Sequence, residues 1–463
     1  EWRGDRRDGR ESGECAACRD QEDVVMHGRL GDGALRLASQ FPLQALADTD
    51  VYLTNNGPEP LQLTIHQSGS GELQAGSQWT QHRTELGPWE SAMVLSFNRY
   101  EGVKAGKSYL FETRVTTAGG DTYRLNQLME GTWWNSTLQH GGETPADGSG
   151  WQSDRAIHRL AGPQELAFAA KFTGRYDDLH YMLTPPQRRE QPEPAEDKLK
   201  VASYNVWALP VIAASIGERL TLLPEYLKGY DALLLQEVFD GRREGFLQAL
   251  AKEYPYQTKV LDKPGVNIHD GGVVIVSRYP IVREAQLVYP QCTGTDCFAD
   301  KGVMYAEVIK GGKAWHLFAT HTASFDTDEA RRLRQIQFGQ IRTLAASLEI
   351  PASDTVIYGG DFNVNKRKFA DDYASMLANL DAHEPGYGGY TEATFDPRIN
   401  PYAGGPLSGG ANVEYLDCLV VRREYGAARH NLNSVWIPRS SDGSLWPASN
   451  LSDHFPVKGE ISR

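Results

Sequence analysis

The stretch Tyr358-Gly359-Gly360-Asp361-Phe362-Asn363-Val364 decides how this chain is expected to fold and where its chemistry lies. It continues the apolar run Thr355-Val356-Ile357-Tyr358, which predicts a strand that ends at two glycines. Side chains two positions apart in an extended segment point to the same side, so Asp361 and Asn363 can face one pocket. The carboxylate can orient a water molecule, and the amide can donate to a phosphoryl oxygen that gains charge during attack. The same residues also suit an ordinary turn after a strand, so a functional interpretation of this stretch depends on the other motifs in the chain.

Strands and helices alternate on both sides of this stretch, from residue 199 to the end of the chain. Apolar residues at helical spacing predict a helix over 327–348, with shorter helices over 216–227 and 246–250. Apolar, β-rich runs predict strands at 199–206, 232–238, 272–276, 304–309, 315–321, 355–358, 414–420 and 455–457. This alternation predicts a layered α/β fold.

A different pattern precedes residue 187. Between 41 and 186, short alternating runs such as 61–65 and 109–115 are separated by turn residues, which predicts an all-β, sandwich-like domain. The Pro-rich, charged residues after this region predict a linker at 187–198. We therefore expect an N-terminal extension at 1–40, an accessory β-sandwich at 41–186 with lipid or partner binding as its candidate role, the linker, and a second domain at 199–463.

The predicted β-sandwich is rich in tryptophan. These residues suit either the core of the sandwich or an exposed surface for lipid or carbohydrate. They are Trp79, Trp89, Trp133, Trp134 and Trp151.

Composition excludes several classes of protein. The chain has 463 residues, of which 40% are hydrophobic and 23% charged, as expected for a globular protein of two domains. Its net charge of -13 argues against nucleic acid as a partner, because such proteins usually present a basic face. No apolar run is long enough to span a bilayer. Because the sequence begins at Glu1 without an initiator methionine, we expect a mature or trimmed form.

Five cysteines are present, and four of them form closely spaced pairs. Cys15 and Cys18 lie in a C-x2-C arrangement, and Cys292 and Cys297 lie in a Gly/Thr-rich turn. Metal or redox chemistry is the alternative for Cys15 and Cys18, but no second pair at zinc spacing accompanies them. Local disulfides in an oxidising compartment are therefore expected, with Cys418 left as a buried free thiol.

Polar side chains recur where the predicted strands of the second domain end. Each alone suits a cap, a surface residue or a hydrogen-bonded filler of the core. Together they predict one site, because α/β folds place sites at strand ends. They are Asn205, Glu237, His321, Asp361, Asn363, Asp417, Asp453 and His454.

The chemistry of this set is coherent. Glu237 and Asn205 offer oxygen ligands, which suit a hard cation such as Mg2+. The two histidines have carboxylate neighbours in the set and suit general acid and base catalysis near neutral pH. No serine or cysteine occupies a nucleophile elbow, so the set favours metal-assisted attack of water on a phosphate ester.

These residues stand in motifs that resemble the endonuclease/exonuclease/phosphatase superfamily and, within it, the bacterial neutral sphingomyelinases. The resemblance covers 199–463. It implies a four-layered, deoxyribonuclease-like α/β sandwich that hydrolyses sphingomyelin to ceramide and phosphocholine at a membrane surface. It also implies a secreted, extracellular bacterial protein, with virulence or hemolysis as possible consequences. The motifs are Ser203-Tyr204-Asn205-Val206, Gln236-Glu237-Val238-Phe239-Asp240, Gly271-Gly272-Val273-Val274-Ile275-Val276-Ser277, Lys301-Gly302, Thr320-His321, Gly360-Asp361-Phe362-Asn363, Leu416-Asp417 and Ser452-Asp453-His454-Phe455-Pro456-Val457.

The resemblance implies that Glu237 ligates a central divalent metal, with Asn205 beside it and Asp453 assisting the metal or His454. Mg2+ is expected, with Mn2+ or Co2+ as alternatives. Relatives often carry a second metal at the edge of the domain. Gly241 and His269-Asp270 stand at the corresponding places here, so one central site is expected.

The resemblance also assigns the catalytic roles. His454 would be the general base for the attacking water, oriented by Asp417 through its other ring nitrogen. His321 would bind the phosphate or assist the departing ceramide oxygen. Asp361 and Asn363 would position water and phosphoryl oxygens.

Relatives use an aromatic-tipped hairpin between the Leu-Asp strand and the Ser-Asp-His motif to enter the membrane. This chain has Trp436 and Leu445-Trp446 in that region. We expect these residues to contact a bilayer, with simple packing inside the fold as the alternative.

Three other functions fit parts of the pattern. A phospholipase C that acts on phosphatidylcholine would share the motifs, since they address the phosphodiester and not the lipid backbone. A nuclease of the same fold would need a basic groove, which the acidic balance disfavours. A binding protein with an inactive catalytic domain is disfavoured by the complete set of acid, base and metal residues. The oligomeric state is not predicted.

Overall fold

The strand predicted to end at Asp361 is present as β19 (Thr355–Asp361), and all of its residues are buried. It lies parallel to β18 (Lys313–His321) and antiparallel to β22 (Asp417–Arg422). Three of the predicted site residues therefore end or begin neighbouring strands. The register pairs His321 with Asp361 across one boundary and Asp361 with Asp417 across the other.

The computed structural model describes residues 47–143, 150–172, 176–186, 189–265, 267–404, 412–442, 444–446 and 448–463. The predicted extension at 1–40 lies outside the described residues, as does the predicted pair Cys15 and Cys18. Thr49–Arg463 forms one compact unit, which contains two layered regions. No helix within the described ranges combines the length and the apolar character needed to cross a bilayer.

Two sheets pack face to face in the region that begins with β12 (Lys198–Asn205). Alternate residues of the inner strands face the other sheet or the outer helices, as the pleat of a strand requires. The first sheet has the order β16 (Ile281–Val288), β17 (Gly302–Lys310), β18, β19, β22, β20 (Ala382–His383). The second has the order β14 (Tyr256–Gln257), β15 (Val274–Ser277), β13 (Ala232–Gln236), β12, β24 (Val457–Ser462), β23 (His430–Val435), β21 (Gly386–Gly389).

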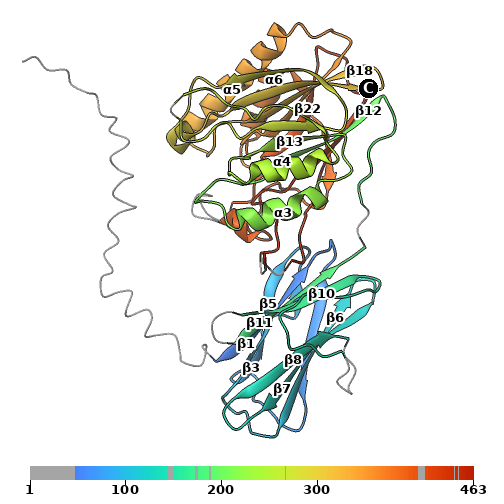
Figure 1. Cartoon of the computed structure of the whole chain (residues 1–463), viewed down its shortest axis with the longest axis vertical. Coiled ribbons are helices and arrows are strands. Elements are labelled where there is room, and N and C mark those ends of the chain that lie inside the picture. Colours follow the sequence, from blue (N-terminus) through green and yellow to red (C-terminus); the bar gives the residue numbers. More distant parts are fainter. Residues whose placement is uncertain are drawn as a thin grey trace, which may run out of the picture. The chain divides into compact units, whose positions relative to one another are not determined.

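Helices cover the outer faces of both sheets (Figure 1). α3 (Ile216–Tyr226) and α4 (Arg243–Ala251) pack on the sheet that contains β12. α5 (Asp328–Ser347) and α6 (Ala370–Leu380) pack on the sheet that contains β19. Two short 3-10 helices, η3 (Gly294–Phe298) and η4 (Pro401–Gly404), lie in connecting segments. The predicted four-layered α/β sandwich is confirmed.

The long helix lies where it is predicted, but not every residue of its apolar pattern is buried. Thr327 caps α5 with its side-chain oxygen, and the apolar side chains Leu333 and Ile341 are buried as their spacing indicates. The other buried residues of this helix are Ala330, Arg334, Gln337, Phe338 and Ala345. Ile336, which shares the apolar pattern, is exposed because it lies on the opposite side of the helix.

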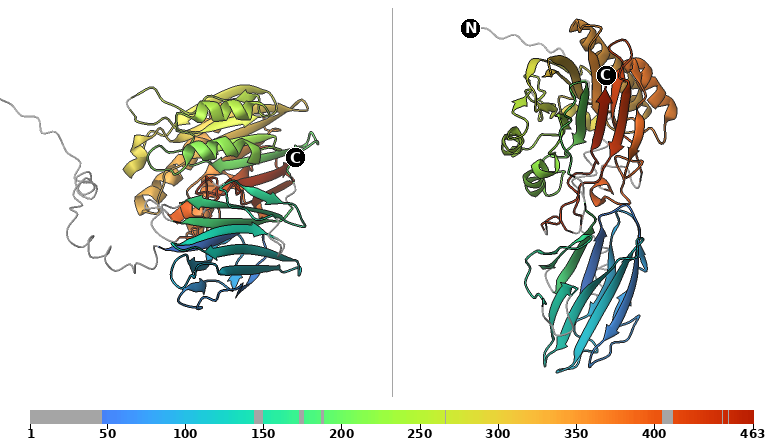
Figure 2. Two further views of the ribbon diagram at one scale, coloured as in Figure 1. Left: turned by 60° about the horizontal axis from the view of Figure 1, so that its bottom comes forward. Right: turned by 90° about the vertical axis from the view of Figure 1, so that its right-hand side faces the viewer.

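The earlier part of the chain is a β-sandwich, as predicted (Figure 2). Its two sheets enclose a core of alternating apolar side chains that includes Leu53, Leu63, Phe97, Phe111 and Tyr181. One sheet has the order β3 (Trp79–Gln81), β5 (Ser91–Asn98), β1 (Asp48–Asn55), β11 (Asp177–Thr184), β10 (Glu165–Phe172), β9 (His158–Leu160). The other has the order β4 (Glu85–Leu86), β2 (Leu61–Ser68), β6 (Ser108–Thr117), β7 (Thr122–Gly131), β8 (Ser136–Gly142).

Gly360 lets β19 approach β18 closely enough to place Asp361. Its φ is 149°, and a Cβ there would lie 2.0 Å from the carbonyl oxygen of Thr320. Gly360→Ala should therefore lower the free energy of unfolding by about 2–4 kcal/mol, because the backbone must move. Urea unfolding followed by circular dichroism measures this loss.

Gly339→Ala is the matched control, since Gly339 lies inside α5 with open space around its Cα. That substitution should stabilise the protein by about 0.5–1 kcal/mol through helix propensity. Equal unfolding midpoints for Gly360→Ala and the wild type would contradict the account of β19.

Candidate active site

The predicted site residues gather at one end of the paired sheets. Asn205 is the last residue of β12, and Glu237 follows β13 directly. β12 and β13 are parallel, so both side chains emerge at the same edge of the sheet. His321 and Asp361, paired on the parallel strands of the other sheet, meet them there.

Asn205 links the two sheets by hydrogen bonds. Its Nδ2 donates to Oε1 of Glu237 at 3.0 Å and to Oδ2 of Asp361 at 3.1 Å. Its Oδ1 accepts from the backbone N–H of Trp207 at 3.0 Å. In this orientation the amide offers protons, not oxygen, to the interior of the site. Holding a cation through its oxygen would require the amide to rotate, which exchanges its nitrogen and oxygen.

Glu237 has an unusual backbone and an unsatisfied oxygen. Its φ of 55° is uncommon for a residue with a side chain and turns the carboxylate into the site. Oε1 accepts from Asn205 and lies 3.9 Å from Nε2 of His321. Oε2 is buried without a hydrogen-bond partner. A buried carboxylate oxygen in this state is costly unless a cation satisfies it.

Asp361 lies between the two histidines. Its Oδ2 is 3.5 Å from Nε2 of His321 and 3.6 Å from Nε2 of His454. Burial alone would raise its pKa, but the charges of His454 and His321 outweigh burial and hold the pKa of Asp361 below its usual value. Asp361 is therefore ionised at neutral pH.

The contact between His454 and Asp417 is the shortest one that an imidazole ring makes in this site. Its Nδ1 lies 2.9 Å from Oδ2 of Asp417, and the Phe395 ring packs edge-on against it at 5.2 Å. Burial lowers the pKa of His454, but Asp417, Asp361 and Asp453 together raise it well above its ordinary value. Nε2 faces Asp361, so one ring nitrogen is held and the other is directed into the site.

Two carboxyl groups beside His454 have raised pKa values. Burial raises the pKa of Asp417 to about 6 and that of Asp453 to about 7. Ser452 Oγ lies 3.2 Å from Oδ1 of Asp453 and donates to the carbonyl oxygen of Asn205 at 2.6 Å. Ser452 thus ties the Asp453-His454 turn to the end of β12.

Asn363 lies at the rim of the same group. Its φ is 51°, and its backbone N–H donates to Oδ1 of Asp361 at 3.0 Å. Its Nδ2 donates to the carbonyl oxygen of Thr322 at 3.1 Å, so the amide is held in place. The positive φ places Asn363 in a turn after β19, and simple strand alternation does not describe the segment.

Sequence reasoning missed the acid–base partners of His321 as site residues. Lys301 lies with Nζ 3.2 Å from Nε2 of His321 and 2.8 Å from Oδ1 of Asp296. Burial, then Lys301, lowers the pKa of His321. The sequence places Lys301 beside Gly302 before an apolar strand, but nothing local to Asp296 indicates that its carboxylate faces this site.

The disulfide between Cys292 and Cys297 is present, as predicted. It closes the segment that contains Asp296, which is buried. Cys418 is a buried free cysteine, also as predicted.

Two groupings of side chains can hold a cation. Oxygen and nitrogen atoms of Asp361, Asp417 and His454 lie within 4.8 Å of one another. However, Nδ1 of His454 and Oδ2 of Asp417 already bond each other. The unsatisfied Oε2 of Glu237, with Asp361 nearby through Asn205, is the better fit for a hard divalent cation.

An ion pair occupies the edge of the domain where the resemblance raised the question of a second metal. Asp270 accepts from Arg243 Nη1 at 2.5 Å and from the backbone N–H of Gly272 at 2.9 Å. The His269 ring packs against Phe239 at 5.5 Å. The expectation of a single central site stays a prediction.

Two of the three expected membrane-contact residues are buried, which corrects the prediction for those two, whereas the prediction for Trp436 stays a prediction. Leu445 and Trp446 are each 3% exposed. Leu445 packs with α3 and α4, whereas Trp446 packs against Ala169 and Met182 of the β-sandwich. Trp436 is half-buried beside the same core as Leu445. The alternative, packing inside the fold, therefore describes Leu445 and Trp446.

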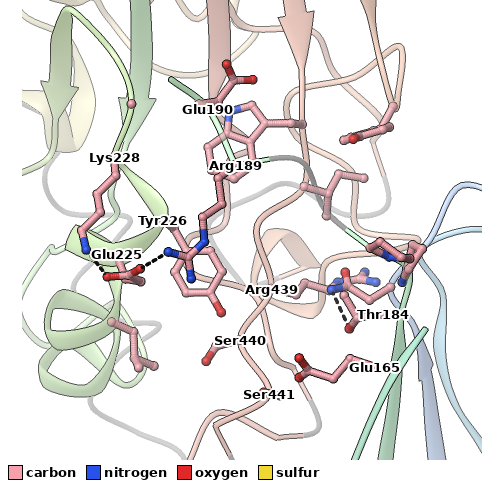
Figure 3. Close-up of a pocket in the computed structure, with 18 of the residues that line it drawn as sticks. Glu165, Thr184, Arg189, Glu190, Glu225, Tyr226, Lys228, Arg439, Ser440 and Ser441 are labelled. Carbon is pink, nitrogen blue, oxygen red and sulfur yellow. Dashed lines mark hydrogen bonds and ion pairs between the residues drawn. The ribbon is translucent and has the colours of Figure 1, made fainter. Parts of the chain in front are cut away.

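A cavity of about 1710 Å3 lies between the β-sandwich and the second layered region (Figure 3). None of the catalytic residues lines it. Glu225 lies in it with Lys228 and with Arg189 at 3.8 Å. Arg439 donates to the carbonyl oxygen of Asn55 at 3.2 Å, and burial lowers its pKa to about 9. The contact between Arg439 and Asn55 joins the two regions, and the cavity adds no catalytic group.

Comparison with known proteins agrees with this geometry. Residues 202–454 match the Endonuclease/Exonuclease/phosphatase family. A phospholipase C of Staphylococcus aureus is 31% identical over 304 residues, which cover 60% of this chain and 91% of that protein. A sphingomyelinase C of Bacillus cereus is 31% identical over 297 residues, covering 57% and 89%. The crystal structure of a beta toxin mutant from Staphylococcus aureus with bound magnesium ions is similar with a TM-score of 0.53 and 30% identity, covering 57% of this chain and all of that one.

Asp417→Asn tests the hydrogen-bonded pair. Because Asp417 is the largest of the carboxylate contributions that raise the pKa of His454, its neutralisation should lower that pKa. NMR titration of the imidazole in metal-free protein measures the change. Asp371→Asn, at an exposed position in α6, is the control and should leave the titration unchanged. A His454 titration that Asp417→Asn fails to shift would exclude the pairing.

Proposed function

We propose, from the premise that this chain belongs to the Endonuclease/Exonuclease/phosphatase family, that it is a metal-dependent phosphodiesterase that hydrolyses sphingomyelin to ceramide and phosphocholine. The observation that carries the proposal is one buried group in which an oriented imidazole, an ionised carboxylate and an unsatisfied carboxylate oxygen converge. This combination suits attack of water on a phosphodiester and leaves no need for a covalent intermediate. Relatives named sphingomyelinase C supply the substrate class.

Glu237 would hold the divalent cation through Oε2, with Asn205 beside it after rotation of its amide. Magnesium is the proposed ion, because the donors are oxygens and a similar structure contains bound magnesium. When bound, such a cation neutralises charge on the phosphate and lowers the pKa of nearby acids, including the attacking water and the imidazole.

His454 would take the proton of the attacking water at Nε2, while Asp417 holds the proton on Nδ1. The water oxygen forms a bond to phosphorus, and the bond from phosphorus to the ceramide oxygen breaks. Asp361 lies 3.6 Å from Nε2 of His454, where it can accept a hydrogen bond from the same water. The ceramide oxygen leaves as an alkoxide that takes a proton from solvent water, and His454 returns its proton to the solvent.

His321 would serve the departing oxygen and the phosphate. Its lowered pKa keeps the imidazole neutral near pH 7, so Nε2 can accept a hydrogen bond from the Lys301 ammonium. Lys301 beside it supplies a buried positive charge. Asn363 would position a phosphoryl oxygen with the N–H of its amide that does not bond Thr322.

Peripheral binding to a membrane is part of the proposal. The segment after Asn205 exposes Val211 and Ile212, and the segment after His321 exposes Phe325. These side chains, which sequence reasoning did not single out, support contact with lipid near the site, in place of Leu445 and Trp446. Secretion of the protein is proposed as well, and the disulfide supports an oxidising compartment.

A phospholipase C that acts on phosphatidylcholine is the second candidate. Relatives named phospholipase C favour it, and the catalytic group described here addresses only the phosphodiester. A nuclease of the same fold remains disfavoured by the net charge of -13.

Release of phosphocholine from sphingomyelin vesicles tests the proposed function. Wild-type protein with Mg2+ should release it, and a chelator should abolish the reaction. Glu237→Gln should lower kcat by about 100-fold or more, because the unsatisfied oxygen loses its charge. Glu244→Gln, at an exposed position in α4, is the matched control and should retain full activity.

Parallel assays on phosphatidylcholine vesicles distinguish the second candidate. Release from phosphatidylcholine alone would assign the phospholipase C activity. Turnover that persists in the chelator, or in Glu237→Gln, would contradict the proposed mechanism.

A further inference from the structure

The turn between β7 and β8 presents two adjacent tryptophans to solvent. Trp133 and Trp134 are each 88% exposed, more than any other aromatic side chain in the part of the chain that the structure describes. From the sequence, these two tryptophans suit either the core or an exposed surface, and the structure places both in solvent. Large apolar rings gain stability from leaving water, so a pair displayed in this way marks an interaction surface.

The turn that carries the tryptophans is held by its own hydrogen bonds. The N–H of Thr132 donates to the carbonyl oxygen of Asn135 at 2.8 Å, and the N–H of Asn135 donates to Thr132 Oγ1 at 3.0 Å. Next to it, buried Arg99 donates to the Oγ and carbonyl oxygen of Ser136 at 2.8 and 3.0 Å. A rigid support reduces the entropy lost on binding, and satisfied backbone groups can enter a less polar layer.

The loop between β5 and β6 lies against this turn. The N–H of Gly131 donates to the carbonyl oxygen of Lys107 at 2.9 Å, and the N–H of Gly106 donates to that of Gly131 at the same distance. The loop therefore brings its own exposed side chains beside the two tryptophans. The tryptophan tip consists of Tyr100, Lys104, Lys107, Trp133 and Trp134.

We propose that the tryptophan tip docks the β-sandwich on the surface of a bilayer of zwitterionic choline lipids. Tryptophan and tyrosine rings favour the interface between headgroups and acyl chains. Lys104 and Lys107 can meet lipid phosphates, while exposed Glu130 beside the turn can meet choline. The charge of the whole chain, -13, disfavours a strongly anionic surface.

The docking proposal rests on the proposed function for one point only, which is that the bilayer contains choline lipids. It gives the β-sandwich a task that the catalytic group does not perform: it holds the protein on the surface that contains the substrate. Loss of the tip should therefore change association with vesicles without changing chemistry on substrate that is dispersed in solution.

Binding to phosphatidylcholine vesicles in the presence of a chelator tests the docking without turnover. Trp133→Ala combined with Trp134→Ala in the full chain should weaken co-flotation by at least about tenfold. Lys104→Glu combined with Lys107→Glu should weaken it less. Tyr256→Ala, which removes an exposed aromatic ring from the second layered region, is the matched control and should bind as the wild type does.

A second measurement does not depend on how the alanine variant folds. Lipids brominated near the headgroup should quench part of the tryptophan fluorescence of the wild type. In Trp133→Phe combined with Trp134→Phe, which keeps aromatic rings at the tip, that quenched part should disappear. Equal quenching in both proteins would place the insertion elsewhere and overturn the proposal.

Other results would also overturn it. Unchanged flotation of the alanine variant would exclude the tip as an anchor. Loss of binding to immobilised oligosaccharides, with vesicle binding intact, would identify a glycan as the occupant. A dimer in the wild type that the alanine variant converts to a monomer, again with vesicle binding intact, would identify a second copy of the chain. Failure of the proposed function would appear separately, as the absence of phosphocholine release by a protein that still binds vesicles.

Discussion

The site depends on the burial of several carboxylates beside two imidazoles at the end of strands that are themselves buried. Asp361 is the centre of this arrangement, because it lies within 3.6 Å of both His321 and His454. Its position follows from the register of β19 between β18 and β22, which Gly360 permits. Excess negative charge in a buried site is costly unless a cation compensates it. A cation bound for this reason would also serve the reaction.

Much of this arrangement was predictable from the sequence, because the positions of the strands and the side chains at their ends are local properties. The apolar run before Gly359 gave β19, and the polar residues after successive strands identified the site. Contacts that depend on the tertiary path were not predictable. Nothing near Asp296 indicates that its ion pair with Lys301 lies beside His321, since this segment meets His321 only in the folded chain. Likewise, the positive φ of Glu237 and Asn363 depends on the packing of the turns around them.

The aromatic residues show why composition alone was insufficient to locate a membrane contact. Trp446 lies in the region where the resemblance predicted exposed aromatic side chains, yet here Ala169 and Met182 of the β-sandwich cover it. Its ring also packs against His180 at 5.5 Å. A domain outside the family match can thus cover a surface that the sequence of the matched region would suggest is free. Exposed rings belong instead to Trp133 and Trp134, which lie in the turn between β7 and β8.

The central claim is that a divalent cation binds at the unsatisfied oxygen of Glu237 while His454 keeps its hydrogen bond to Asp417. Anomalous diffraction from crystals soaked in Mn2+ measures the position of the ion directly. The account predicts a peak about 2.0–2.3 Å from Oε2 of Glu237, with the contact between His454 and Asp417 intact. A peak between Asp361, Asp417 and His454, with Glu237 unligated, would contradict it.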